Sequence, residues 1–401
     1  MKKIVTITFM VLCLLTTAGC GRQIPIKGPS SASSAGTEPS KGAPHSSPSQ
    51  KDRVSSLLNS MTIEQRVGQL FFVRCPQRGA EQDITTWHLG GYLLFGRDFQ
   101  DRTANEIIQK LNAYQEAAGR DSGVPLLIGT DEEGGSVVRL SANPRICAQK
   151  FRSPQQLFAG DGMDAITANA HEKDVLLRAL GINVNFAPVA DVSTDSHDFI
   201  FARSFGQDAS STGKYVAATV DQMNRDHMGS VLKHFPGYGN NTDTHTGIAV
   251  DNRPIKTFES SDFLPFQSGI RQSDGKTAVL VSHNIVKAMD PALPASLCPA
   301  VHKILRRQLG FSGVIMTDDL AMAAVQSYAG NGSAALMALK AGNDMVLTSD
   351  YRTQIPQILA ALEDGRLSER DIDAACRRVL LWKQSLGMLT ENQPYSAEAA
   401  K

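Results

Sequence analysis

Regular alternation of helical and strand-like segments is the feature that most constrains the fold of this chain. From Val54 onward, segments with apolar residues at helical spacing are followed by short apolar runs of the length of buried strands. Roughly eight such runs occur: FFVR, GGYLLFG, VPLLIGTD, INVNFAPVAD, GSVLKHFPG, TAVLVSH, SGVIMTDDL and DMVLTS. Strands that alternate with helices predict a parallel sheet with crossover helices.

The number of repeats favours a sheet that closes on itself. About eight strand–helix units in about 340 residues fit a single (β/α)8 TIM-type barrel. An open doubly wound sheet is the alternative, but no G-x-G-x-x-G motif follows the first strand-like run. We therefore predict an α/β fold with one barrel domain over residues 51–395.

The segment before the barrel has the composition of a leader followed by a linker. Residues 1–20 combine two lysines, a short apolar run and Thr17-Ala18-Gly19-Cys20, which resembles a bacterial lipobox. We expect lipidation at Cys20 and an extracytoplasmic protein anchored to the bacterial cell membrane; a plain secretory signal is the alternative. Residues 21–50 are rich in Ser, Pro and Gly and predict a flexible spacer.

Charge and composition exclude several classes of function. Lys+Arg and Asp+Glu both number 40, so no basic excess indicates a nucleic-acid partner. The nine His are scattered without metal-ligand spacing, and we expect neither a metal nor a cofactor. The cysteines of the barrel form no C-x-x-C pair; buried thiols are favoured over disulfides, although pairing stays open for Cys75, Cys147, Cys298 and Cys376.

Polar and ionisable residues recur where the strand-like runs end. In a barrel the carboxyl ends of all strands converge on one face, which is where active sites lie. Each residue taken alone could cap a helix or form an ion pair, so their recurrence carries the prediction of a site. The residues are Asp131, Asp191, Lys233, His234, His283, Asp318, Ser349 and Asp350.

The stretch KHFPGYGNNTDTHTG, residues 233–247, is the most specific of these. A strand delivers Lys233 and His234, and a glycine-rich loop then carries Asp243 and His245. An Asp two residues before a His can orient the imidazole and raise its basicity for acid/base chemistry. An exposed loop whose Asp stabilises a turn is the equally weighted alternative.

Two further stretches place carboxylates at strand ends. In GVIMTDDLAM, Asp318 can serve as a covalent nucleophile at a sugar carbon, whereas we expect Asp319 to be structural, for instance as a helix cap. In GTDEEGGSVVRL, Asp131 and Arg139 suit charge-assisted hydrogen bonds to sugar hydroxyls, and a glycine-rich turn with an ion pair is the alternative.

Together these stretches resemble glycoside hydrolase family 3, in its bacterial β-N-acetylglucosaminidase branch. The family patterns, in chain order, are D-x-E-G-G with a downstream Arg, K-H-F-P-G-[HY]-G, D-[ST]-H, and [ST]-D before an apolar run, and they occur here in that order. The resemblance extends from about Val54 to Gly387 and implies a (β/α)8-type barrel. The chain departs from many members of the branch by having Tyr238 in place of a second His and Thr244 in place of a Ser.

The resemblance implies a role for each matching residue. Asp318 would be the nucleophile, His245 the acid/base, and Asp243 the residue that holds and polarises His245. The remaining matches would bind the sugar at the cleavage subsite: Asp131, Arg139, Arg203, Lys233 and His234.

The implied activity is that of a retaining exo-β-N-acetylglucosaminidase, a β-N-acetylhexosaminidase, acting on cell-wall fragments without a cofactor. The expected partner is a carbohydrate, and we expect a monomer. Phosphate in place of water as acceptor, a different β-linked sugar, and a non-catalytic carbohydrate-binding lipoprotein are the alternatives.

Overall fold

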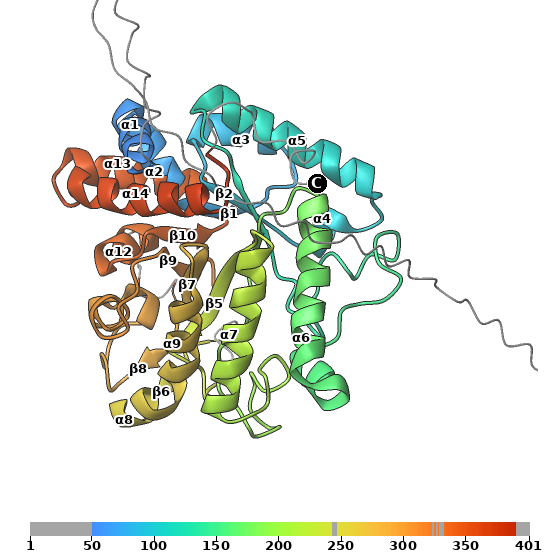
Figure 1. The fold of residues 1–401 in the computed structure, drawn as a ribbon. Helices are drawn as coiled ribbons and strands as arrows, with labels where there is room; N and C mark the ends of the chain where they lie inside the picture. Colours follow the sequence, from blue (N-terminus) through green and yellow to red (C-terminus); the bar gives the residue numbers. More distant parts are fainter. Residues whose placement is uncertain (1–49, 243–246, 323–324, 326–327, 329–332, 390–401) are drawn as a thin grey trace, which may run out of the picture. The chain divides into compact units, whose positions relative to one another are not determined.

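The eight strand-like runs form a closed parallel barrel in the computed structural model, which confirms the predicted fold class (Figure 1). The structure describes residues 50–242, 247–322, 325, 328 and 333–389, so the predicted leader and linker, Cys20 included, lie outside it. Around the barrel the strand order is β1-β10-β9-β7-β5-β4-β3-β2. The pairing of Phe71 in β1 with Val346 in β10 closes the barrel.

The strands are short, and every pair between neighbours is parallel. Nearly all their residues are buried, as expected for strands enclosed by helices on the outside and by side chains within. Their bounds are β1 Phe71–Arg74, β2 Gly91–Leu94, β3 Leu127–Thr130, β4 Val184–Asn185, β5 Gly229–Phe235, β7 Thr277–Val281, β9 Ile315–Asp319 and β10 Met345–Thr348.

Helices surround the barrel (Figure 1). Polar side chains cap the first turns of several of them. Thr103 and Glu106 form a capping box at α5, and Ser153 and Gln156 form another at α6. The helices are α1 Gln50–Ser60, α2 Ile63–Gln69, α3 Ala80–Trp87, α4 Gly96–Phe99, α5 Ala104–Asp121, α6 Pro154–Ala179, α7 Ala209–Arg225, α8 Ile255–Thr257, α9 Phe263–Gln272, α10 Pro299–Lys303, α12 Ala334–Ala341, α13 Tyr351–Glu363 and α14 Glu369–Ser385. The short turns are the π-helices η1 Phe258–Asp262 and η3 Ile304–Gln308 and the 3-10 helix η2 Ala295–Leu297.

The strands differ from the sequence prediction in two places. The run INVNFAPVAD contributes only the two residues of β4 to the ladder, because Pro188 has no N–H to donate; an isolated bridge from Val189 to Lys233 follows. A second, two-stranded parallel sheet of β6 (Val250–Asp251) and β8 (Ile285–Val286) was not predicted. Two-residue strands are too short to produce a periodic pattern.

The barrel interior is filled by large side chains. The rings of Phe72 and Phe186 pack with their centroids 5.2 Å apart. Gly91 and Gly129 on the neighbouring strands leave room for these rings, since a Cβ at either glycine would overlap Phe72. Phe186 also lines a cavity at the carboxyl ends of the strands, so the packed interior forms part of the wall of that cavity.

The four described cysteines are free. Cys75, Cys298 and Cys376 are buried, as the sequence favoured, whereas Cys147 is half-buried. Burial raises the pKa of Cys75 to about 11 and that of Cys376 to about 12. Buried thiols with raised pKa values are poor nucleophiles at neutral pH.

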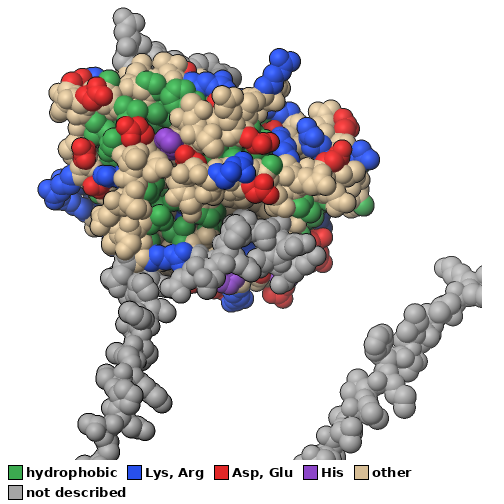
Figure 2. All heavy atoms as spheres, turned by 90° about the horizontal axis from the view of Figure 1, so that it is seen from above, with side chains coloured by type: hydrophobic (Ala, Val, Ile, Leu, Met, Phe, Trp, Pro, Cys, Tyr) green, Lys and Arg blue, Asp and Glu red, His purple; other side chains and the backbone are tan. Residues whose placement is uncertain are grey.

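The face of the molecule seen in Figure 2 carries basic and acidic side chains interspersed with small hydrophobic groups. This mixture agrees with the equal numbers of basic and acidic residues in the sequence. Among the described residues, no helix has the length and hydrophobicity that a membrane span requires.

Candidate active site

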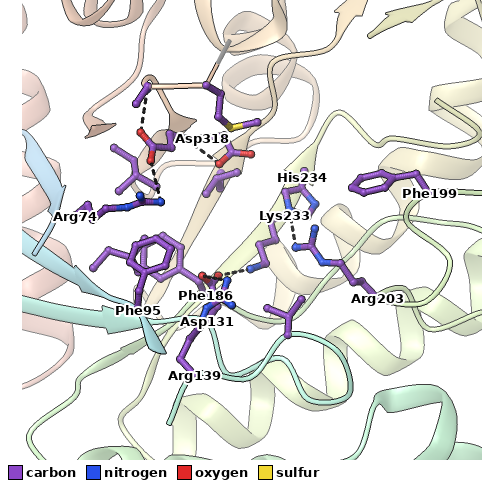
Figure 3. A pocket seen from close by; sticks show the side chains of 17 residues that line it. Arg74, Phe95, Asp131, Arg139, Phe186, Phe199, Arg203, Lys233, His234 and Asp318 are labelled. Carbon is purple, nitrogen blue, oxygen red and sulfur yellow. Dashed lines mark hydrogen bonds and ion pairs between the residues drawn. The ribbon is translucent and has the colours of Figure 1, made fainter. Parts of the chain in front are cut away.

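A cavity of about 490 Å³ opens at the carboxyl ends of the barrel strands (Figure 3). Every strand of the barrel supplies a lining residue on the strand or within two residues of its end. In strand order these are Arg74, Leu93, Asp131, Phe186, Lys233, Leu280, Asp318 and Leu347. This is the face where (β/α)8 barrels hold their active sites.

The structure brings together six of the residues predicted from the sequence. They come from β5, from β9 and from the loops that follow β3 and β4, and they line one cavity: Asp131, Arg139, Arg203, Lys233, His234 and Asp318. His245 and Asp243 lie outside the described residues.

Lys233 lies between two carboxylates. Its Nζ is 2.7 Å from Asp131 Oδ1 and 2.6 Å from Glu133 Oε1, and the lysine side chain is 3% exposed. Both bonds are charge-assisted, and together they fix the direction of the ammonium group. An ammonium has three hydrogens, so Lys233 can offer the third to a ligand in the cavity.

Glu133 also binds Arg203. Arg203 donates Nη2 to Glu133 Oε1 at 2.7 Å and Nε to Oε2 at 3.1 Å, a bidentate pair that holds both groups in one plane. Burial alone would raise the pKa of the Glu133 carboxyl, but the positive charges of Lys233 and Arg203 hold it well below its ordinary value. Glu133 is therefore an anion that orients two cations beside the cavity.

His234 has a defined tautomer. Arg203 Nη2 lies 3.1 Å from His234 Nε2 and can only donate, so Nε2 accepts. His234 Nδ1 lies 2.7 Å from Asp191 Oδ2 and therefore carries the proton and donates it. Asp191 is fully buried and also accepts the backbone N–H of His234. The neutral ring is held by a partner on each side.

Asp318 and Asp319 end β9 and make different contacts, although both line the cavity. Asp318 Oδ1 accepts the backbone N–H of Asp319 at 2.8 Å. Asp319 Oδ1 accepts the N–H of Ala321, and its Oδ2 is 3.8 Å from Arg74 Nη2. Burial raises the pKa of Asp319. The bond to Ala321 gives Asp319 the turn-stabilising contact expected of the structural member.

The loop after β3 turns back sharply so that Arg139 reaches the cavity. Gly134 has φ +101°, and a side chain there would overlap the carbonyl of Arg152. The buried carboxylate of Glu132 accepts the backbone N–H groups of Arg139 and Leu140 at 2.9 and 2.8 Å. Arg139 Nη2 then lies 3.6 Å from Asp131 Oδ2, so the ion pair considered as an alternative is present inside the cavity.

Four residues of this region were not assigned a role from the sequence: Arg74, Phe95, Glu133 and Asp191. Arg74 and Arg139 place their guanidinium carbons 4.1 and 5.5 Å from the centroid of the Phe95 ring, so the ring supports both cations. The D-x-E-G-G pattern contained a signal for Glu133. Asp191 appeared as a strand-end carboxylate but without its partner.

Within the described part of the chain, no group of three or more His, Cys, Asp or Glu side chains is arranged to hold a metal ion.

The chain matches a known family over most of its length. Residues 62–381 match the family described as "Glycosyl hydrolase family 3 N terminal domain". A β-hexosaminidase of Xylella fastidiosa (strain M12) is 35% identical over 267 residues, which are 65% of this chain and 76% of that protein.

Solved structures agree with the sequence match. The structure of a family 3 β-N-acetylglucosaminidase from Paenibacillus sp. str. FPU-7 is 30% identical with a TM-score of 0.76, and the match covers 83% of this chain and 64% of that one. A β-N-acetylhexosaminidase from Beutenbergia cavernae DSM 12333 is 30% identical with a TM-score of 0.70, over 81% of this chain and 99% of that one. The family match extends over more than half of the chain, and the chain therefore belongs to glycosyl hydrolase family 3 and is a glycoside hydrolase.

Proposed function

We propose that this protein is a retaining exo-β-N-acetylglucosaminidase with Asp318 as its nucleophile. The observation that carries the proposal is the position of Asp318 at the carboxyl end of β9, in the same cavity as Lys233, His234 and Arg203. The names of the relatives in Xylella, Paenibacillus and Beutenbergia support N-acetylhexosamine as the sugar.

The charges around the cavity suit a neutral, hydroxyl-rich ligand. Carboxylates and cations alternate there in ion pairs, which leave donors and acceptors directed into the cavity but little net charge. In the proposal these groups hydrogen-bond the hydroxyls of the terminal sugar at the cleavage subsite: Asp131, Arg139, Arg203, Lys233 and His234.

The proposed reaction has two displacements at the anomeric carbon. In the first, an Asp318 carboxylate oxygen bonds to that carbon while the glycosidic C–O bond breaks and His245 gives a proton to the departing oxygen. In the second, His245 takes a proton from water, the water oxygen bonds to the carbon, and the bond to Asp318 breaks. Two inversions return the β configuration.

Asp243 supports His245 in this proposal by holding the imidazole and raising its basicity. His245 gives its proton as an imidazolium cation and accepts one as a neutral imidazole, so neither form places a second anion beside the nucleophile. This arrangement suits an anionic acceptor such as phosphate as well, so phosphorolysis is the second outcome that the assays must distinguish.

The nucleophile is tested by Asp318→Asn on 4-nitrophenyl N-acetyl-β-D-glucosaminide, with Asp319→Asn as the matched control. Asp318→Asn should lower kcat by at least about 10⁴-fold, because the amide cannot form the glycosyl ester. Asp319→Asn keeps an oxygen for the N–H of Ala321 and should lose far less. Equal activity in the Asp318→Asn variant and the wild type would exclude Asp318 as nucleophile.

The acid/base is tested by His245→Ala with two leaving groups. General acid catalysis is worth about 10²–10⁴-fold when the leaving group needs a proton and much less when it does not. The variant should therefore lose kcat/KM on the phenyl glycoside far more than on the 2,4-dinitrophenyl glycoside. Equal losses on both would remove His245 from this role.

A rate panel tests the sugar and the acceptor. Wild-type rates on the β-linked N-acetylglucosaminide, glucoside and xyloside, each with and without inorganic phosphate, should be highest on the first. Formation of a sugar 1-phosphate would identify a phosphorylase. Tight binding of N-acetylglucosamine oligosaccharides without turnover would support the non-catalytic alternative instead.

We further propose that lipidation at Cys20 anchors the enzyme outside the cytoplasmic membrane, where its substrates would be cell-wall fragments. The lipobox-like sequence and the Ser/Pro-rich residues that follow motivate this proposal. Cys20→Ala should move the protein from the membrane fraction to the soluble fraction of a bacterial host. An unmodified N-terminal peptide in the wild-type protein would refute the anchor.

A further inference from the structure

Arg253 is half-buried and binds two buried carboxylates just beyond the end of β6. Its Nε lies 3.1 and 3.0 Å from the two oxygens of Asp251, and its Nη1 lies 3.0 Å from Asp262 Oδ1. Asp251 and Asp262 are 4% and 1% exposed. A third donor, Nη2, reaches the backbone carbonyl of Gly237 at 3.4 Å. The guanidinium therefore bonds to three separate points of the chain.

Two of these points lie on opposite sides of the segment that carries Asp243 and His245. Gly237 follows β5 and precedes the segment, whereas Asp251 and Arg253 follow it. The contact from Arg253 to Gly237 thus joins residues 16 apart in sequence. Arg253 closes the base of this loop.

The chain before this segment and the chain after it are also hydrogen-bonded to other parts of the fold. On the first side, the N–H of Tyr238 donates to Asp191 Oδ1 at 2.8 Å, and Asp191 is the carboxylate that holds His234. On the second side, β6 pairs with β8, and the N–H of Ile285 donates to Ala249 O at 2.8 Å. In Figure 1, β6, β8 and α8 lie together beyond the ends of β5 and β7.

The glycines of the FPGYG motif permit these contacts. Gly239 has φ +52°, and a Cβ there would overlap the guanidinium of Arg253. A Cβ at Gly237 would overlap the carboxylate of Asp262. The two glycines therefore leave the space in which Arg253 contacts residues on both sides of the loop.

We propose that Arg253 is a positioning residue for acid/base catalysis, because it fixes both ends of the segment that carries Asp243 and His245. The inference rests on the proposed function, in which His245 is the acid/base. Proton transfer requires the acid within hydrogen-bond distance of the leaving oxygen, and a displacement of about 1 Å can cost about 10²-fold in rate. Arg253 itself does not touch the sugar in this proposal.

The experiment compares kcat/KM of Arg253→Met on the phenyl and the 2,4-dinitrophenyl N-acetyl-β-D-glucosaminides. Because kcat/KM reports the step in which the leaving group departs, the ratio of the two values measures assistance by the acid and cancels any loss of folded protein. The rate on the phenyl glycoside should fall by roughly 30-fold or more and that on the dinitrophenyl glycoside by less than about 3-fold.

Arg306→Met is the matched control. Arg306 is another half-buried arginine that binds a fully buried carboxylate, Asp344, and lies over an aromatic ring, Phe311. It lies next to the turn that leads into β9, at the end of the barrel opposite the cavity. This variant should lower Tm as Arg253→Met does but leave the ratio of the two rates unchanged.

Equal losses on both substrates in Arg253→Met, or the same change of ratio in Arg306→Met, would overturn the inference. Arg253→Lys keeps the charge but cannot reach three partners at once, so it should recover part of Tm and little of the ratio. A failure of the proposed function is distinguishable, because His245→Ala would then leave the ratio unchanged as well.

Discussion

Replacement of Glu133 by Gln tests the role of a residue whose importance appears only in the structure. The change removes one negative charge and keeps the shape of the side chain. Lys233 is then left buried and Arg203 half-buried, with Asp131 as the carboxylate that still contacts Lys233. Removal of one partner from a buried ion pair costs about 3–5 kcal/mol, and because the amide oxygen is retained we expect a loss of about 3 kcal/mol. For a domain of about 340 residues that lowers Tm by roughly 4 °C.

The same change should impair catalysis beyond its effect on stability. Lys233 and Arg203, which bind the sugar in the proposed function, would no longer be held in one orientation, and a displacement of about 1 Å in groups that position a substrate can cost about 10²-fold. We therefore expect kcat/KM on 4-nitrophenyl N-acetyl-β-D-glucosaminide to fall about 100-fold, equivalent to about 2.7 kcal/mol. The assays are thermal unfolding and initial rates at a temperature where the variant is fully folded.

Asp344→Asn is the matched control for this prediction. Asp344 is also fully buried and also pairs with two cations, Arg306 and Arg378, but it precedes β10 at the end of the barrel opposite the cavity. Its loss should lower Tm by a similar amount and change kcat/KM by less than about 3-fold. The reasoning is refuted if Glu133→Gln has the Tm of the wild type or loses no more kcat/KM than Asp344→Asn.

Three further outcomes follow from burial and stacking. Burial lowers the pKa of Lys383 to about 7, so between pH 7 and its ordinary value of 10.5 the unfolded chain binds more protons than the folded one. The free energy of unfolding should rise between pH 7 and 8.5 by up to ~1.4 kcal/mol per pH unit. Denaturant titrations that give the wild type and Lys383→Met the same dependence of this free energy on pH would contradict the prediction. Phe95→Ala removes the ring beneath two arginines and should raise KM several-fold with a smaller change in kcat; an unchanged KM would argue against support of the sugar site by this ring. Alkylation of the native protein followed by peptide mapping should label Cys147 before the three buried thiols of Cys75, Cys298 and Cys376. Labelling of all four at the same rate would show that the barrel opens.

The barrel was predictable from the sequence because its signal is local. Each strand is a short apolar run between helical patterns, and the parallel strands alternate with helices along the chain. The same order placed Asp131, Lys233 and Asp318 at strand ends, so their convergence followed from the fold class alone.

Short and irregular elements were not predictable in this way. β6 and β8 are two residues each and pair across 35 residues of chain between Val250 and Ile285. The run before Asp191 contributes fewer residues to the ladder than its apolar length indicated, because a proline interrupts it.

The sequence by itself determined the family, the barrel and the identity of the candidate nucleophile, because each of these is written in residues that are near one another in the chain. The tertiary structure alone decided which charged groups pair. Glu133 finds its partner Arg203 at a separation of 70 residues, and Lys233 binds Asp131 at a separation of 102. These pairs depend on the register of strands and loops around the barrel, and a buried charge is stable only where that register supplies its partner.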